Sequence, residues 1–344
     1  MRWLYHQFHV LWLTLAAAFA ITGVCLQVYH RILPVTVSDT KNSYIKWVDF
    51  DVTAEAMNDA LRYDVDSYGQ TIHLNWIELL AYLGARYGGD FSRYQKANLD
   101  ALVQNLQQGT TMSELTADMK YYSYYREAYD AVLGGMAGPY EIQETDDSGN
   151  AVWVSKYGLK AFSPIARYFP YNDYDDFGAS RSYGYQREHL GHDLMGQVGT
   201  PIICVESGYV EALGWNQYGG WRIGIRSFDR KRYYYYAHLR KNYPYHKSLS
   251  EGCTVQAGDV IGYLGRTGYS RTENTNNIDE PHLHFGLQLI FDESQKDGSN
   301  EIWIDCYQLT RFLSAHRSET IRNSQTKEHN RAWQMKDPAI PTGS

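Results

Sequence analysis

The sequence predicts an α+β protein with an N-terminal membrane helix, then a helical domain, then an antiparallel β-sheet domain. Three observations support this class: an uncharged apolar run near the start, apolar residues spaced three and four apart up to about residue 140, and short apolar runs between turns after residue 160. A chain of 344 residues is long enough for about two folded units. The sequence predicts four segments: a membrane anchor or signal segment at 1–31, a helical domain at 45–140, a β domain at 160–315 and a polar tail at 318–344.

The apolar run at 10–28 contains 19 residues and no charge. As a helix it would be about 28 Å long, which is close to the thickness of the hydrocarbon layer of a membrane. A cleaved signal peptide is the alternative, because Ala18-Phe19-Ala20 resembles a small-x-small cleavage site. The run continues past that site, which favours an uncleaved single-pass anchor. Cleavage would instead give a secreted protein.

The helical domain is predicted from apolar side chains that recur on helical faces. The repeats are Ala54, Met57, Leu61 and Val65; Trp76, Leu79, Leu80 and Leu83; and Leu99, Leu102, Val103 and Leu106. The capping-box pattern at 111–114 predicts a fourth helix, which Gly134 and Gly135 would end. A polar turn at 146–149 is expected to separate this domain from the next.

The β domain is predicted from short apolar runs bounded by glycine-rich or charged turns. These runs lie at 201–205, 209–213, 221–226, 233–238, 260–264 and 282–290. Side chains alternate along the last run, PHLHFGLQLI, so Leu283 and Phe285 face the core while His282 and His284 project from the other face. Those two histidines would lie about 6.6 Å apart, which suits a metal site or a general base.

Two further segments contain candidate site residues. If the segment from His189 to Asp193 were fully extended, its ends would lie about 13 Å apart, too far to share one metal ion. The segment must therefore bend if both residues are ligands, and Gly191 allows a bend. The remaining candidate is His238, which ends the predicted strand at 233–238, where a cleft could open.

The order and spacing of these segments resemble the lysostaphin-type zinc metalloendopeptidases, which cut bacterial peptidoglycan. The matching segments are REHLGHD, GTPI, ESGYV, YAHL, VQAGDVIG, GRTG and HLH. The resemblance runs from Arg187 to about Phe291 and does not include the membrane segment or the helical domain. It implies a lysostaphin-like fold for the β domain, with Zn²⁺ as cofactor and peptidoglycan peptides as substrate.

The resemblance also implies a role for each of five residues. His189, Asp193 and His284 would be the zinc ligands, while His238 and His282 would be the catalytic histidines. His282 is then the candidate general base, and His238 would stabilise the oxyanion or protonate the leaving amine. Two imidazoles and one carboxylate leave a fourth position on zinc for water, as hydrolytic zinc sites require.

The sequence departs from the family pattern in three places. His192 stands where the family usually has an apolar residue, and it is a competing ligand candidate, although in an extended segment it would point away from Asp193. The link at 269–281 is longer and more polar than usual, and we expect it to form one wall of the substrate cleft. An acidic segment is a candidate latency switch, although acidic runs are usually solvated. Its residues are Asn172, Asp173, Asp175 and Asp176.

These observations predict a membrane-anchored, extracytoplasmic zinc endopeptidase that hydrolyses peptide bonds in bacterial peptidoglycan. The 32 basic and 39 acidic residues give a net charge of −7, which argues against nucleic-acid binding. One alternative is a catalytically silent lysostaphin-like scaffold at the cell envelope, although silent versions generally lose ligand residues and this chain keeps all five positions. Another is a glycan-binding or glycan-cleaving role for the helical domain, through the tyrosines at 121–129 or Glu78.

Overall fold

The computed structural model describes residues 44–182, 186–298 and 300–341. Every element named below belongs to the compact unit Asp49–Ser344. The membrane segment predicted at 10–28 lies outside the described residues. Within the described residues, none of the helices has the length and apolar character needed to span a bilayer.

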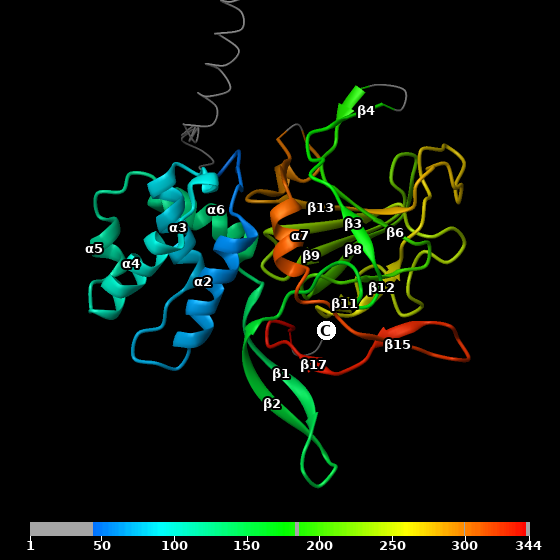
Figure 1. Ribbon diagram of the computed structural model, residues 1–344. Helices are drawn as coiled ribbons and strands as arrows, with labels where there is room; N and C mark the ends of the chain where they lie inside the picture. The colour runs from blue at the N-terminus through cyan, green and yellow to red at the C-terminus, as the bar shows by residue number, and fades with distance from the viewer. Residues whose placement is uncertain (1–43, 183–185, 299, 342–344) are drawn as a thin grey trace, which may run out of the picture. The chain divides into compact units, whose positions relative to one another are not determined.

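The N-terminal part of this unit is helical, as the apolar repeats predict. Its helices are α2 (Ala54–Ser67), α3 (Trp76–Tyr87), α4 (Lys96–Gln107), α5 (Met112–Thr116) and α6 (Tyr122–Leu133), with a short 3₁₀ turn at Phe91–Arg93 (Figure 1). Side chains cap the first two helices: Thr53 accepts a hydrogen bond from the backbone N–H of Ala56, and Asn75 accepts from two backbone N–H groups of α3. The long repeats predict helices well because each one supplies an apolar face that the neighbouring helices bury.

The single helix predicted from the capping box to Gly134 is wrong. Thr111 and Glu114 do form the capping box, but α5 ends at Thr116 and buries none of its residues, so no packing favours its extension. A separate helix, α6, ends at Gly134. Within α6, Tyr125 and Tyr129 are buried, so these two tyrosines contribute to the helical core and not to a glycan-stacking surface.

The polar turn at 146–149 is the loop of a β-hairpin and not a divide between domains. It joins β1 (Ala137–Thr145) to β2 (Ala151–Leu159), which pair along their whole length (Figure 1). Asp146 stabilises the loop because its side chain accepts hydrogen bonds from the backbone N–H groups of Ser148 and Asn150.

The β domain is built on an eight-stranded antiparallel sheet with the order β11-β8-β9-β10-β13-β6-β3, in which β14 also pairs with β13. The strands are β11 (Thr254–Val255), β8 (Gly208–Asn216), β9 (Gly220–Ser227), β10 (Arg232–Ala237), β13 (His282–Leu289), β6 (His192–Gly196), β3 (Tyr171–Asp173) and β14 (Ile302–Ile304). The described part of the chain therefore has the predicted class, a mostly antiparallel β fold that follows N-terminal helices.

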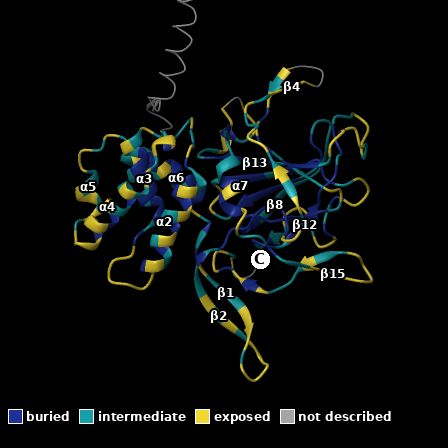
Figure 2. Ribbon diagram, viewed as in Figure 1, coloured by how far each residue is buried: buried dark blue, intermediate teal, exposed yellow. Residues whose placement is uncertain are grey.

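One face of this sheet is apolar and buried. Figure 2 shows the central strands in the colour of buried residues, and β10 and β13 contribute Tyr234, Tyr236, Leu283 and Phe285. Helix α7 (Tyr307–Leu313) also belongs to the β domain and is not predicted from the sequence. Because this face forms the core, the opposite face of the same strands is available to form a site.

Specific contacts join the helical part to the β domain. Trp76 of α3 stacks on Phe312 of α7 with ring centroids 5.9 Å apart. The buried Arg232 of β10 donates to the carbonyl of Ala131 in α6 at 2.9 Å and pairs with the buried Glu206 at 2.7 Å. Loss of Arg232 would leave the buried carboxylate of Glu206 without its cationic partner and would also remove the hydrogen bond that joins β10 to α6.

Short strands complete the domain. They are β4 (Ser180–Ser182), β5 (Gln186–Glu188), β7 (Pro201–Ile203), β12 (Val260–Tyr263), β15 (Thr320–Arg322), β16 (His329–Arg331) and β17 (Met335–Lys336), with a 3₁₀ turn at Glu293–Gln295. The last three lie in the segment predicted as a polar tail. There β17 pairs with β1, and Met335 is buried beside Phe162 and Tyr263. The described part of this segment is thus packed onto the domain.

Candidate active site

The antiparallel register of β13 and β6 brings three candidate residues to one face of the sheet. His284 pairs with Asp193, and the neighbouring His282 pairs with Met195. Directly paired residues project from the same face, so His282, His284 and Asp193 share the face opposite the buried Leu283 and Phe285. The predicted alternation of side chains along β13 is therefore the one observed.

His189 reaches the same face because the chain turns before β6 begins at His192. The backbone N–H of His189 donates to the carbonyl of Ala179 at 3.0 Å, which fixes its position. Gly191 is needed here for close approach: a Cβ at this position would lie 2.6 Å from Cε1 of His284. The bend between His189 and Asp193 therefore exists, and the missing side chain of Gly191 makes room for the His284 ring.

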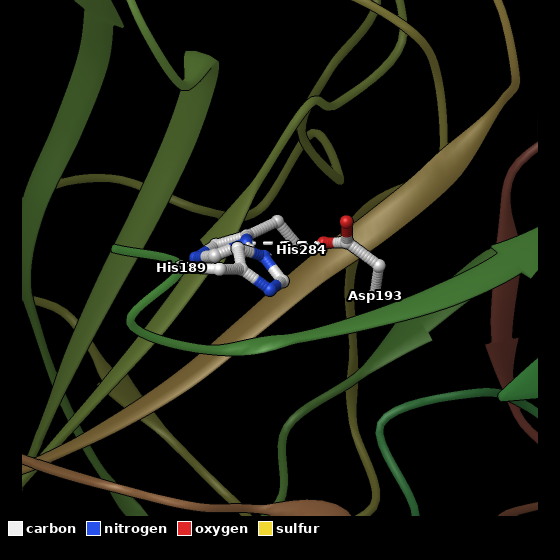
Figure 3. A group of neighbouring side chains, drawn as sticks. All are labelled: His189, Asp193 and His284. Carbon is white, nitrogen blue, oxygen red and sulfur yellow. Dashed lines mark hydrogen bonds and ion pairs between the residues drawn. The ribbon is translucent and has the colours of Figure 1, made fainter. Parts of the chain in front are cut away.

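His189, Asp193 and His284 form a compact cluster. One ligand atom from each residue lies within 4.8 Å of the others. His189 Nε2 is 3.0 Å from Asp193 Oδ1 and 2.8 Å from His284 Nδ1, and His284 Nδ1 is 3.1 Å from the same carboxylate oxygen (Figure 3). His189 is buried and the other two side chains are partly buried.

The donor set of this cluster fits a zinc ion. Nδ1 of His189 lies 3.0 Å from the backbone carbonyl of Asp176. A carbonyl oxygen can only accept a hydrogen bond, so we assign the proton to Nδ1, and the lone pair of Nε2 then faces His284 and Asp193. Lone pairs of two imidazoles and a carboxylate that meet at one point need a proton or a cation between them. Zinc accepts this combination of nitrogen and oxygen ligands.

The electrostatics of the cluster follow from burial and close contact. Burial favours a raised pKa for the Asp193 carboxyl, but hydrogen bonds from His189 and His284 hold that pKa well below its usual range. Burial also favours a lowered pKa for His189, yet its hydrogen bonds to Asp176 and Asp193 prevail and raise the pKa to about 9. For His284, burial lowers the pKa below 6.5.

His238 lies beside the cluster, at the end of β10. Its backbone has a φ of +62°, in the left-handed region, and its Nδ1 lies 2.9 Å from the carbonyl oxygen of Thr267. The ring centroid of His238 is 4.8 Å from that of His282 and 5.8 Å from that of His284. Burial lowers the pKa of His238 well below 6.5, which keeps this imidazole neutral at pH 7.

His282 also lies next to the cluster without supplying one of its three ligand atoms. Its Nδ1 is 2.8 Å from the carbonyl oxygen of Glu280, while its Nε2 is 3.7 Å from Asp193 Oδ1. As with His238, a carbonyl holds the proton on Nδ1, so Nε2 is the basic nitrogen.

His192 lies on the opposite face of β6 from the cluster. It pairs with Phe285, and its ring centroid is 5.5 Å from that of Tyr307. Its ring nitrogens lie 3.5 Å from a carboxylate oxygen of Asp176 and 3.7 Å from one of Asp173. The alternation of β6 thus separates His192 from the cluster, as the sequence analysis expects for an extended segment.

Asp176 and Arg181 also lie near the cluster. Asp176 belongs to the acidic segment that is a candidate latency switch, while Arg181 is not predicted as part of the site. Asp176 contacts the Nδ1 edge of His189, with Oδ2 3.2 Å away, so it lies on the side of that ring that faces away from the cluster. Arg181 donates to Asp176 at 2.6 Å and to Oδ2 of Asp193 at 3.2 Å, which leaves Oδ1 of Asp193 facing the histidines. A single arginine in a three-residue strand gives no sequence signal for such a contact.

The cluster opens into a cleft of about 780 Å³. His238 lines it as well, and the floor contains Tyr233, Tyr235 and Trp303. Gly224 lies under Tyr233, where a Cβ would overlap the tyrosine hydroxyl. From the link at 269–281, which we expect to form a wall, Tyr269 lines the cleft. The site can therefore hold an extended polymer segment against aromatic side chains beside the histidines.

Comparison with known proteins identifies the family of this domain. Residues 187–297 match the model of peptidase family M23. The L-Ala–D-Glu endopeptidase of Bacillus subtilis is 38% identical over 130 residues, which is 38% of each chain. Lysostaphin of Staphylococcus simulans is 37% identical over 98 residues, which is 28% of this chain and 17% of lysostaphin. The chain therefore contains an M23 peptidase domain, and the resemblance to the lysostaphin-type peptidases is confirmed.

A solved structure shares the fold over a longer part of the chain. It is a provisionally named glycyl-glycine endopeptidase from Ruminococcus gnavus, with a TM-score of 0.51 and 21% sequence identity, and the alignment covers 83% of this chain and 95% of that one. The likeness in fold thus extends beyond residues 187–297. The matches to the two curated relatives span 38% and 17% of their lengths, so they compare a domain and not whole proteins.

Proposed function

We propose that this protein is a zinc-dependent endopeptidase that hydrolyses peptide bonds in bacterial peptidoglycan. The observation that carries the proposal is the cluster of His189, Asp193 and His284, with His238 and His282 beside it, on the face of the sheet that opens into the cleft. These five residues all lie within the segment that matches an M23 peptidase, and one relative is named as an L-Ala–D-Glu endopeptidase.

In the proposed reaction His189, Asp193 and His284 hold the ion. When bound, zinc supplies Lewis-acid polarisation of the scissile carbonyl and lowers the pKa of a coordinated water towards 7. His282 accepts the proton of the attacking water at Nε2, because Glu280 holds the proton on Nδ1.

The role of His238 depends on its protonation state. Because Thr267 holds the proton of the neutral ring on Nδ1, Nε2 of the resting His238 carries a lone pair and accepts a hydrogen bond. His238 donates to the oxyanion or to the leaving amine only after Nε2 has taken up a proton, and the proton that His282 accepts from the attacking water is the one available for this transfer. We therefore propose that His238 is neutral when substrate binds and acts as a donor later in the reaction.

The proposal is tested by the products that the protein releases. Zinc-loaded protein is incubated with purified peptidoglycan, with and without a chelator, and the new amino and carboxyl ends are identified by mass spectrometry. We expect new peptide ends only when zinc is present. If zinc-loaded protein binds the polymer and releases nothing, the silent scaffold becomes the better account.

Zinc binding at pH 8 is expected to release about one proton per ion from His189, in addition to the proton lost by water that the ion coordinates. With a pKa of about 9, the metal-free His189 is protonated at that pH, and it must lose this proton to offer Nε2 as a ligand. His284, whose pKa is lowered by burial, is already neutral. Calorimetric titrations in buffers with different ionisation enthalpies measure the released protons.

The raised pKa of His189 also has a consequence for the stability of the metal-free protein. A raised pKa stabilises the folded state fully below the ordinary value of 6.5, and this contribution disappears as the pH rises through 9.

The calorimetric titration can also contradict the assignment of this proton to His189. It would do so if the observed enthalpy of zinc binding at pH 8 were independent of the buffer.

We also propose that the segment at 10–28 anchors the protein in the cell membrane and that residues 31–344 lie outside the cytoplasm. The proposal is supported by the length of the uncharged run and by the extracytoplasmic position of the proposed substrate. We expect the full chain to fractionate with membranes and to resist extraction by high salt. A mature protein whose first residue is Ile21 would instead indicate a cleaved signal and a secreted enzyme.

A further inference from the structure

Arg222 lies on the same face of the sheet as the cluster, on β9, two strands away from His284. Tyr236 of β10 pairs with Ile223, so the next residues along, Ala237 and Arg222, lie at the same level of the sheet. Ala237 in turn pairs with His284. Because neighbouring strands are about 4.8 Å apart, the Cα atom of Arg222 is about 10 Å from that of His284.

Arg187 lines the same cleft from a different element, β5. Its guanidinium group lies between two aromatic rings, 5.1 Å from the ring centroid of Tyr218 and 5.2 Å from that of Tyr269. It also donates a hydrogen bond to the hydroxyl of Tyr269 at 2.7 Å. These contacts hold the charge of Arg187 in place over the cleft. Burial raises the pKa of Tyr235 on the floor, and Arg187 and Arg222 both oppose that rise, so both charges lie near this ring.

The guanidinium groups of Arg187 and Arg222 are not neutralised by the protein. Among the described residues, neither has a carboxylate within 4.0 Å, and the Nε atom of each is buried without a hydrogen-bond partner. A buried donor without an acceptor is unfavourable, and a charged donor gains most from an ionised acceptor. The two groups are thus suited to receive an anion in the cleft.

The other charged residues of the cleft do not cancel this pair. Arg181 is occupied by Asp176 and Asp193, and Lys296 pairs with Glu211. Other carboxylates line the cleft away from the cluster. They all belong to exposed residues, so water solvates them at the rim of the cleft. They are Glu188, Asp297 and Glu301. The half-buried positive charges inside the cleft therefore outweigh the exposed negative charges in their effect on a bound ligand.

We propose that Arg222, together with Arg187, binds a carboxylate of the peptide substrate, so that the enzyme takes acidic stem peptides in preference to uncharged oligoglycine bridges. This inference rests on the proposed peptidase function and specifies its substrate class. An extended peptide advances about 3.3 Å per residue, and the arginine side chain bridges part of the distance of about 10 Å from His284. The recognised carboxylate thus lies within about three residues of the scissile bond.

The test compares peptides that differ only in their carboxylates. The probes are L-Ala-γ-D-Glu-L-Lys-D-Ala with free carboxylates, the same peptide with the D-Glu α-carboxyl amidated, the same peptide with the C-terminus amidated, and pentaglycine with both ends blocked. For zinc-loaded protein we measure kcat/KM for each probe that is cut and Kd for each that is not. One of the two amidations is expected to weaken recognition about 10- to 100-fold, the range for a hydrogen bond to a charged group. The amidation that does so identifies the carboxylate.

The variant Arg222→Gln should remove this discrimination and leave the zinc content unchanged. Arg222→Lys keeps the charge without the planar fork and should retain part of the preference. The matched control is Arg322→Gln, an exposed arginine on β15 outside the cleft, which should behave as the wild type. If Arg222→Gln does not fold, as judged by far-UV circular dichroism, Arg187→Gln and Arg222→Lys are used in its place.

The outcomes separate this inference from the function on which it rests. Equal recognition of acidic and amidated peptides by the wild type, or unchanged discrimination in the folded Arg222 variants, would overturn the inference, as would a failure of the wild type to bind any acidic peptide. Cleavage of blocked pentaglycine in preference to all stem peptides would also overturn it, while the proposed peptidase function would stand. A carboxylate preference in Kd with no cleavage would support the inference and count against the peptidase.

Discussion

Replacement of His284 by alanine is expected to abolish zinc binding and hydrolysis together. The change leaves His189 and Asp193 as the remaining candidate ligands of the cluster, and two protein ligands do not make a stable zinc site. The loss in zinc affinity should exceed the roughly 10- to 100-fold that removal of an outer-shell partner causes. Elemental analysis after dialysis against a weak chelator measures the bound zinc, and peptidoglycan hydrolysis is assayed on the same sample.

His192→Gln is the matched control for this experiment. His192 lies on β6 next to Asp193, but its side chain is on the opposite face of the strand. We expect the control to keep one zinc ion per chain. Full zinc occupancy in the His284 variant would disprove the ligand assignment, and loss of zinc in the His192 variant alone would make His192 the ligand in its place.

Replacement of His282 or His238 by alanine is expected to lower kcat by about 10²-fold or more while the protein keeps its zinc. Both residues lie beside the cluster, yet neither supplies one of its three ligand atoms. The expected size of the loss is that of a general base or of an oxyanion donor. Zinc content, kcat and KM are measured for each variant against the wild type.

The two histidine variants also distinguish the roles proposed for these residues. Loss of His282 removes the base, so activity should recover in part when imidazole or a similar small base is added. His329→Ala on β16 is the control, because this histidine lies outside the cleft, and it should retain full activity. Near wild-type kcat in the His238 or the His282 variant would exclude that residue from the mechanism.

Much of the candidate site is predictable from sequence because local rules determine it. The alternation along β13 places His282 and His284 on one face from the identity of the apolar residues alone. The need for a bend before Asp193 follows from the length of an extended chain. The roles of the five residues, in contrast, come from the resemblance to a family and not from alternation or spacing.

The features that sequence reasoning misses depend on contacts between distant segments. Arg222 enters the cleft because β9 pairs with β10. The sequence of β9 alone does not reveal which residues of the neighbouring strands lie beside Arg222. Arg181 of β4 contacts Asp193 of β6, and no local pattern in the sequence encodes this contact. The helix predicted over 111–134 fails for a related reason: its capping box is correct, but whether a helix continues depends on the apolar face that its neighbours can bury.

We propose that zinc at the cluster of His189, Asp193 and His284 makes this protein a hydrolase. The most direct test is to strip the protein of metal and to titrate zinc back while the cleavage of purified peptidoglycan is followed. We predict that activity is absent in the stripped protein, rises linearly with added zinc and reaches its plateau at one zinc ion per chain. Activity that survives complete removal of metal, or zinc that binds in this ratio without restoring cleavage, would contradict the claim.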